Sequence, residues 1–383
     1  MPLPKSFTRA LYYPYWFVEL FTWAKSFRQN PLIGSYWLNR CGLHVARVAI
    51  AHGLFHFRLL LLAPLLPAAD RREFLRNGFI LKRNVLSADD FARLKAEAEG
   101  YQGLVREFVE GTTLTQRAFL TQQERARLPA IRAFTDGSRL DRLMRWCSSK
   151  NRPPFFFIEN LCNHANVVPQ PDPQRDFHSD TFHPCVKGWL FIDGADDRNG
   201  PHVYVPGSHR LTWKRLKWEY RESLEACKHG DQRQPGRYWD GSFRVSDADL
   251  DAMGLRPTAL HVPENTLLIG NVHGFHRRGE ATEPSRRMTI WMQARDNPFN
   301  PLFSPFPRAT ARLFETVWKR ELEKQDNKKI PTGAQRNQSH RFIPFMRRNF
   351  LSKILARFDE GCRVCYVMKR RCGMSSQKTS RSL

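Results

Sequence analysis

The sequence lacks the features that define several common protein classes. Its 383 residues include eight cysteines, scattered without the regular spacing of a disulfide framework, which favours a reducing compartment. No apolar run is long and uninterrupted enough for a signal peptide or a membrane-spanning helix, because basic and histidine side chains break the most apolar segment, 43–66. We therefore expect a cytoplasmic protein in which this segment forms a helix lying on a surface.

Acidic residues are also scarce. Lys and Arg number 61 against 37 Asp and Glu, which gives a formal net charge of +24 and a pI of about 10.2. Such an excess points to anionic partners: phospholipid or glycolipid head groups, nucleic acid, or a charged small substrate. Nucleic acid is the least favoured of these, because the basic residues are dispersed and the sequence contains no recognised nucleic-acid-binding module.

Composition divides the chain into three parts. Residues 1–70 mix aromatic and basic side chains, which is typical of an amphipathic element on an anionic membrane, although a helical extension packed on the rest of the protein would read similarly. Residues 71–297 form the expected catalytic domain. Residues 298–383 form a basic, helical extension with a flexible tail, whose cysteines Cys362, Cys365 and Cys372 lack an evident fourth ligand for zinc.

Local patterns predict a mainly β domain with flanking helices, an α+β fold. A helix should end before Gly78 and a second should run from a Ser87 cap to Glu99, while residues 103–150 read as mostly helical. Apolar runs predict strands at 155–161, 186–192, 202–205, 266–269 and 288–293, and an amphipathic helix is expected at 311–323.

A short pattern, His178-x-Asp180, carries the chemistry. On a strand the two side chains would share a face, because strand residues alternate with period two. Two imidazoles and one carboxylate form the facial triad of mononuclear non-haem Fe(II) oxygenases, so a second histidine is needed. His276 and His273 both follow a predicted strand. His183, three residues after Asp180, would point away on a regular strand.

These motifs resemble the phytanoyl-CoA dioxygenase family. His178-x-Asp180 is followed by Asn199-Gly200-Pro201, by 206–210 (Pro-Gly-Ser-His-Arg), by His276 and by Arg287, in the family's order and over residues 71–297. The resemblance implies a double-stranded β-helix (jelly-roll) core, a single Fe(II), 2-oxoglutarate as co-substrate and O₂. It also implies His178, Asp180 and His276 as iron ligands, with Arg287 holding the far carboxylate of 2-oxoglutarate.

Some assignments stay open. Arg286 and Arg287 face opposite sides of a strand, so only one of them can reach the co-substrate, and Lys187 either assists it or is an ordinary strand lysine. The function expected is hydroxylation of a C–H bond in a small or amphiphilic, anionic substrate such as a lipid, glycolipid or metabolite. The alternatives are a non-catalytic metal-binding jelly roll and a nucleic-acid-binding protein.

Overall fold

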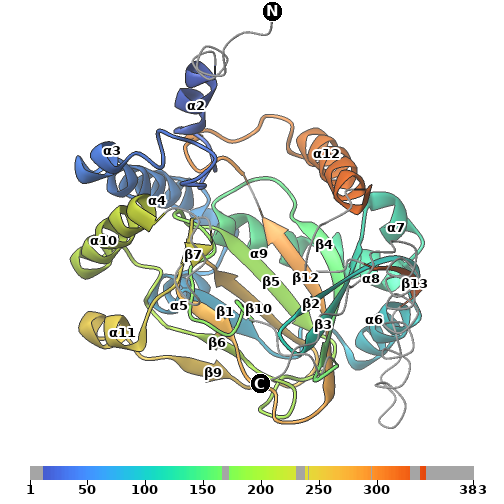
Figure 1. Cartoon of the computed structure of the whole chain (residues 1–383). Coiled ribbons are helices and arrows are strands. Elements are labelled where there is room, and N and C mark those ends of the chain that lie inside the picture. Colours follow the sequence, from blue (N-terminus) through green and yellow to red (C-terminus); the bar gives the residue numbers. More distant parts are fainter. Residues whose placement is uncertain are drawn as a thin grey trace, which may run out of the picture.

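A large antiparallel sheet forms the centre of the protein. The computed structural model describes residues 12–165, 172–229, 238–239, 241–294, 296–327 and 337–341 (Figure 1). Within them the large sheet has eight strands in the order β1-β10-β5-β12-β4-β3-β2-β13. Their bounds are β1 Phe79–Lys82, β2 Gln102–Glu110, β3 Thr113–Phe119, β4 Phe155–Asn163, β5 Val186–Phe191, β10 Thr266–Asn271, β12 Ser285–Ala294 and β13 Asn337–Arg341.

A second, smaller sheet completes the jelly roll. It has the order β11-β6-β9, with β6 His202–Tyr204, β9 Thr258–Leu260 and β11 His276–Arg278. An isolated β-bridge between His178 and His276 extends it by one position. The chain passes back and forth between the two sheets. In the large sheet the neighbouring strands are β4, β12, β5 and β10. In the small sheet the order is the His178 bridge, β11, β6 and β9. This is the strand order of a double-stranded β-helix, which confirms the expected fold.

Helices cover the outside of the large sheet and both ends of the molecule (Figure 1). They are α2 Tyr13–Glu19, α3 Tyr36–Arg40, α4 Leu43–Leu61, α5 Ala68–Asn77, α6 Ala88–Glu99, α7 Gln122–Ala126, α8 Pro129–Thr135, α9 Ser138–Ser148, α10 Trp213–His229, α11 Asp247–Met253 and α12 Pro307–Asn327, with a 3₁₀ turn at Ala63–Leu65 and a small hairpin of β7 Tyr238–Trp239 and β8 Ser242–Phe243. None of the helices that the structure describes is long and apolar enough to cross a membrane.

The main core lies between the large sheet and helices α5, α6 and α9. Alternate residues of β12, Met288, Ile290 and Met292, point into it. Residues 55–66 also contribute four buried side chains to the same cluster: Phe55, Leu59, Leu62 and Leu66. No break in packing separates this part of the N-terminal segment from the sheet, and the division near residue 70 stays a prediction from composition.

The predicted helical stretch 103–150 is wrong in its first part. Residues 102–119 form the β2–β3 hairpin, and helices α7 to α9 begin only after it. Gly111 makes the turn with φ +60°, and the β-branched threonines Thr113 and Thr115 favour a strand after it. The predicted strands at 155–161, 186–192, 202–205, 266–269 and 288–293 are confirmed as β4, β5, β6, β10 and β12. The predicted cap is confirmed as well: the Ser87 hydroxyl accepts a hydrogen bond from the Asp90 amide. Cys362, Cys365, Cys372 and the predicted flexible tail lie outside the described residues.

Candidate metal centre and the cavity beside it

Two histidines from distant parts of the chain lie directly opposite each other. The amide of His178 donates to the carbonyl of His276 and the amide of His276 donates to the carbonyl of His178, both at 3.0 Å. Residues paired in this way across an antiparallel ladder project to the same face. The segment around His178 is a single bridge followed by a bend, not the regular strand expected from the sequence, yet the pairing alone brings both imidazoles together.

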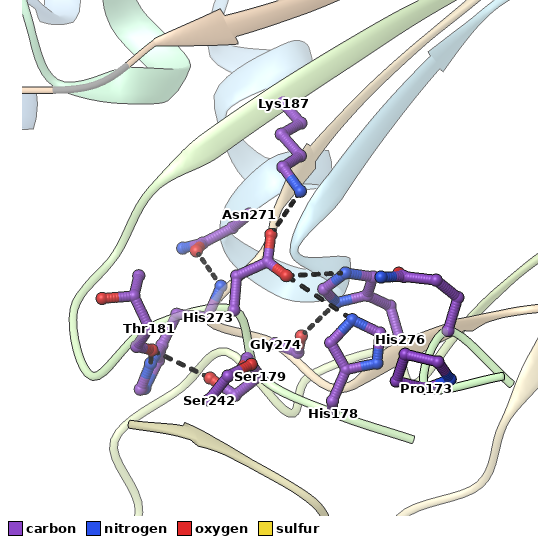
Figure 2. Close-up of polar contacts among 12 residues, drawn as sticks. Pro173, His178, Ser179, Thr181, Lys187, Ser242, Asn271, His273, Gly274 and His276 are labelled. Carbon is purple, nitrogen blue, oxygen red and sulfur yellow. Dashed lines mark hydrogen bonds and ion pairs between the residues drawn. The ribbon is translucent and has the colours of Figure 1, made fainter. Parts of the chain in front are cut away.

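The carboxylate of Asp180 completes the group. Its Oδ1 lies 3.5 Å from Nε2 of His178 and 3.8 Å from Nε2 of His276. One ligand atom from each of the three side chains lies within 4.8 Å of the others. Figure 2 shows His178, His276 and Lys187 directed at this shared carboxylate. Two histidines and one carboxylate, with their ligand atoms directed at one position, match the donor set of a mononuclear iron site.

Backbone carbonyls fix the orientation of both imidazoles. Nδ1 of His178 lies 2.8 Å from the carbonyl of Asp176, and Nδ1 of His276 lies 2.9 Å from the carbonyl of Gly274. A carbonyl oxygen only accepts hydrogen bonds, so each Nδ1 must carry the proton. Both Nε2 lone pairs are therefore free to bind a cation, which is the usual arrangement around metal-binding histidines.

Lys187 holds Asp180 in its ionised form. Nζ of Lys187 is 2.6 Å from Oδ2 of Asp180, and Nζ of Lys25 donates to the Asp180 backbone carbonyl at 2.7 Å. Burial acts to raise the pKa of Asp180, but the Lys187 charge and the two histidines outweigh it and hold that pKa well below its usual range. Because Lys187 engages Oδ2, Oδ1 is the oxygen available to a metal.

The protonation state of His276 also suits a bound cation. Burial, and next the proximity of His178, lower the pKa of His276 to about 3. The ring is therefore neutral near pH 7, the form in which imidazole binds a metal.

Next to the ligands lies a small cavity of about 90 Å³ with a buried arginine in its wall. His178, His276, Lys187 and the indoles Trp189 and Trp291 contribute to the same wall. Only 8 % of Arg287 is exposed, and its Nη1 has no hydrogen-bond partner among the described residues.

Arg287 can bind an anion there. Burial lowers its pKa to about 10, which still leaves it charged at neutral pH. A buried guanidinium with an unused donor fits a carboxylate, which it can bind through two parallel hydrogen bonds. The residues present therefore fit both an iron ion and the dicarboxylate 2-oxoglutarate.

The alternative candidates for the co-substrate arginine and the third metal ligand, Arg286 and His273, lie outside this site. Arg286 points to the other side of the sheet, where it contacts Asp193 at 3.1 Å and Glu99 at 2.7 Å, and it does not line the cavity. His273 is buried with Nδ1 3.0 Å from the Thr181 carbonyl, outside the group that could hold a metal.

The sequence did not indicate three further residues that lie near the site. His202 lines the cavity, and its ring stacks on that of His276 with centroids 5.7 Å apart. Thr115 also lines the cavity, with a buried hydroxyl that has no partner. Lys25 comes from the N-terminal segment. His202 lies on a predicted strand, so the sequence could have indicated that its ring lies near the site. Thr115 could not be found in this way, because its segment has the pattern of a helix.

Comparisons with known structures give distant neighbours. The epimerase SnoN from nogalamycin biosynthesis is 16% identical, covering 60% of this chain and 83% of its own, with a TM-score of 0.41. AviO1 from Streptomyces viridochromogenes is 22% identical, covering 61% of this chain and 96% of its own, with a TM-score of 0.38. HygX from Streptomyces hygroscopicus, solved with nickel and 2-oxoglutarate bound, is 16% identical, covering 60% and 86%, with a TM-score of 0.37.

A search of curated proteins gives no significant match. A scan against protein families matches residues 74–244 to the phytanoyl-CoA dioxygenase family. The matched range includes His178 and Asp180 and stops before His276 and Arg287, which the fold brings to the same cavity. Residues 74–244 of this chain are thus a phytanoyl-CoA dioxygenase (PhyH) family domain.

Proposed function

We propose that the protein is an Fe(II)- and 2-oxoglutarate-dependent oxygenase that hydroxylates a C–H bond of a small or amphiphilic, anionic substrate. The observation that carries this proposal is the position of Arg287, a buried arginine with an unused donor, in the wall of the cavity formed by His178 and His276. A protein that only bound a metal would gain nothing from this buried charge, because burying a cation with an unused hydrogen-bond donor costs stability.

The roles divide between two neighbouring regions. His178, Asp180 and His276 would hold the iron, and Arg287 would bind the far carboxylate of 2-oxoglutarate. When bound, these two groups supply O₂ activation coupled to oxidative decarboxylation of 2-oxoglutarate to succinate and CO₂. The indoles of Trp189 and Trp291 form an apolar part of the cavity wall.

A larger cavity on the other side of Asp180 is the proposed substrate site. Its volume is about 340 Å³, within the range of small-molecule pockets. Its lining includes the Trp23 indole, Lys25, and the carboxylates Glu19 and Asp296. Because the acids oppose a negative charge, the part of the substrate that reacts should be polar and uncharged, with its anionic group held further out.

The test is a substrate screen that follows oxygen. Purified protein with Fe(II), 2-oxoglutarate and ¹⁸O₂ is incubated with anionic lipids, glycolipids and phosphorylated metabolites, and products are analysed by mass spectrometry. The proposal expects succinate formation that a substrate stimulates, with one labelled oxygen atom in the product and neither result with His178→Ala. A product that is epimerised or cyclised without gaining oxygen would contradict hydroxylation.

A further inference from the structure

Helix α4 exposes large apolar side chains although its buried face is already filled. Its buried residues are four polar and four apolar ones: His44, Arg47, Val48, Ala51, His52, Phe55, Arg58 and Leu59. A surface helix of a globular protein normally turns charged and polar side chains to water on the face opposite its buried one. The outward face of α4 therefore needs its own explanation.

Three of the four buried polar residues of α4, His44, Arg47 and Arg58, are hydrogen-bonded within the protein. Nε2 of His44 lies 2.8 Å from a carboxylate oxygen of Glu219 on α10. Arg47 donates to the carbonyls of Leu20 and Ala24 at 2.9 and 2.7 Å. These contacts, and those of Arg58 with the carbonyls of Ser149 and Asn300, fix which face of the helix points inward.

The opposite face carries an apolar stripe, which we call the α4 stripe, with the exposed His56 at its edge. Its members lie three or four positions apart and so share one side of the helix: Ala46, Ala49, Ile50, Gly53, Phe57, Leu60 and Leu61. The four large side chains are strongly exposed, Ile50 at 54%, Phe57 at 47%, Leu60 at 73% and Leu61 at 52%. No residue of the stripe is charged, and it extends over about 22 Å of helix.

Tryptophans with basic partners stand on the helices beside the stripe. Helices α3 and α10 both contact α4, and the three helices gather on one side of the molecule (Figure 1). Trp37 of α3 is 70% exposed with the Arg40 guanidinium 5.6 Å from its ring centre. Trp213 of α10 is 71% exposed with the Lys217 ammonium 5.7 Å from its ring centre.

The charges of these basic residues are available to a partner. Within the described part of the chain, Arg40, Lys217 and the neighbouring Lys214 form no ion pair with an acidic side chain. Exposed tryptophans next to Lys and Arg are typical of the boundary between lipid head groups and acyl chains.

We propose that the α4 stripe, with Trp37 and Trp213 at its sides, docks this protein on an anionic lipid bilayer surface. The apolar stripe enters the outer acyl region, the indoles lie at the head-group level, and Arg40, Lys214 and Lys217 contact lipid phosphates. An apolar stripe with a basic border matches an anionic membrane better than a protein partner, and the net charge of +24 adds long-range attraction. This inference goes beyond the proposed reaction and does not depend on it.

Vesicle flotation with the full chain tests the proposal. Vesicles of phosphatidylcholine alone are compared with vesicles of phosphatidylcholine and phosphatidylglycerol at about 3:1. The double variant Phe57→Ser/Leu60→Ser should lower partitioning onto the mixed vesicles at least about tenfold, since two buried apolar contacts are lost. The matched control is Leu313→Ser/Val317→Ser on α12, whose side chains are 63% and 55% exposed, and it should bind like the wild type.

Further variants separate the outcomes. Lys214→Glu/Lys217→Glu should lose affinity for the mixed vesicles and little for the neutral ones. His178→Ala should bind vesicles normally, so failure of the oxygenase proposal would leave this result intact. Equal vesicle binding by the wild type and the Phe57→Ser/Leu60→Ser variant, or no binding by either, overturns the proposal. If the wild type is instead dimeric without lipid and that variant monomeric, the stripe is a contact between two copies.

Discussion

Arg286 and Arg287 are adjacent in the sequence and opposite in environment. In β12 the odd-numbered residues Arg287 and Trp291 face the cavity, while Arg286 reaches carboxylates on the other side of the sheet. A strand places neighbouring side chains on opposite faces whatever their chemistry. Substituting each arginine in turn therefore tests whether the guanidinium of Arg287, and not that of Arg286, binds 2-oxoglutarate.

Arg287→Ala should weaken 2-oxoglutarate binding about 10- to 100-fold, because a hydrogen bond between charged groups contributes about 1.5–3 kcal/mol. Arg287→Lys keeps the charge but loses the two-pronged geometry, so its affinity should lie between those of the wild type and Arg287→Ala. Arg286→Ala should bind 2-oxoglutarate normally. Anaerobic calorimetry of the metal-loaded proteins measures all of these affinities, and an equal loss in Arg286→Ala would refute the assignment.

At the scale of the elements, the turn between α5 and β1 is fixed by Gly78. This residue ends α5 with φ +87°, and its carbonyl accepts from the Asn271 amide at 2.8 Å, at the end of β10. A Cβ there would lie 2.5 Å from the His209 ring and from the Tyr204 hydroxyl. The turn thus joins the edge of the large sheet to the start of the segment that carries His276.

Gly78→Ala should lower the free energy of unfolding by about 1–3 kcal/mol, since a left-handed conformation and a close contact both act against a side chain. Gly53→Ala is the control: Gly53 lies in α4 with nothing within 4 Å of its Cβ position, so alanine should stabilise by about 0.5–1 kcal/mol. Urea denaturation midpoints compare the two. A neutral Gly78→Ala would show that the turn tolerates an ordinary residue.

The elements also show what a sequence can and cannot predict here. Strands β4, β5, β10 and β12 were predictable because each is a short apolar run with β-branched or aromatic residues. The β2–β3 hairpin was missed because its charged residues, such as Arg106 and Glu107 on β2, resemble an exposed helix face when the pairing partner is unknown. The sequence alone does not show which strands are neighbours. It therefore could not predict the Lys187–Asp180 ion pair or the place of Thr115 in the cavity.

At the scale of the whole molecule, a group of buried histidines connects α4, α10 and the jelly roll. The rings of His52 and His273 lie 4.7 Å apart, and the buried Arg215 donates to the His273 carbonyl at 3.1 Å. Burial, and next the Arg215 charge, hold the pKa of His52 and of His273 well below its usual range. Burial, followed by the Arg210 charge, lowers the pKa of His209 to about 3.

This group should make the fold sensitive to acid. A histidine whose pKa is lower in the folded state stabilises the fold fully above its unfolded pKa of about 6.5, and below it the unfolded chain gains the proton. For His209 the loss should continue from about pH 6.5 towards pH 3, at about 1.4 kcal/mol per pH unit for each histidine that stays neutral. Urea midpoints should therefore fall steeply between about pH 7 and pH 5.

A variant tests the source of that slope. His209→Gln should make the slope shallower by the share of one histidine, because His52 and His273 still contribute. A midpoint that stays constant down to about pH 5 in the wild type would mean that these histidines can be protonated within the fold.

The central claim is that His178, Asp180 and His276 hold an iron to which 2-oxoglutarate binds. The most direct measurement is an anaerobic titration of the metal-free protein with Fe(II) and then 2-oxoglutarate, following the weak visible charge-transfer band of the chelate. We expect one iron per chain and a band in the wild type, both retained in His273→Gln and lost in His276→Ala. Iron binding that survives His276→Ala, or iron-loaded wild type that gives no band with 2-oxoglutarate, would contradict it.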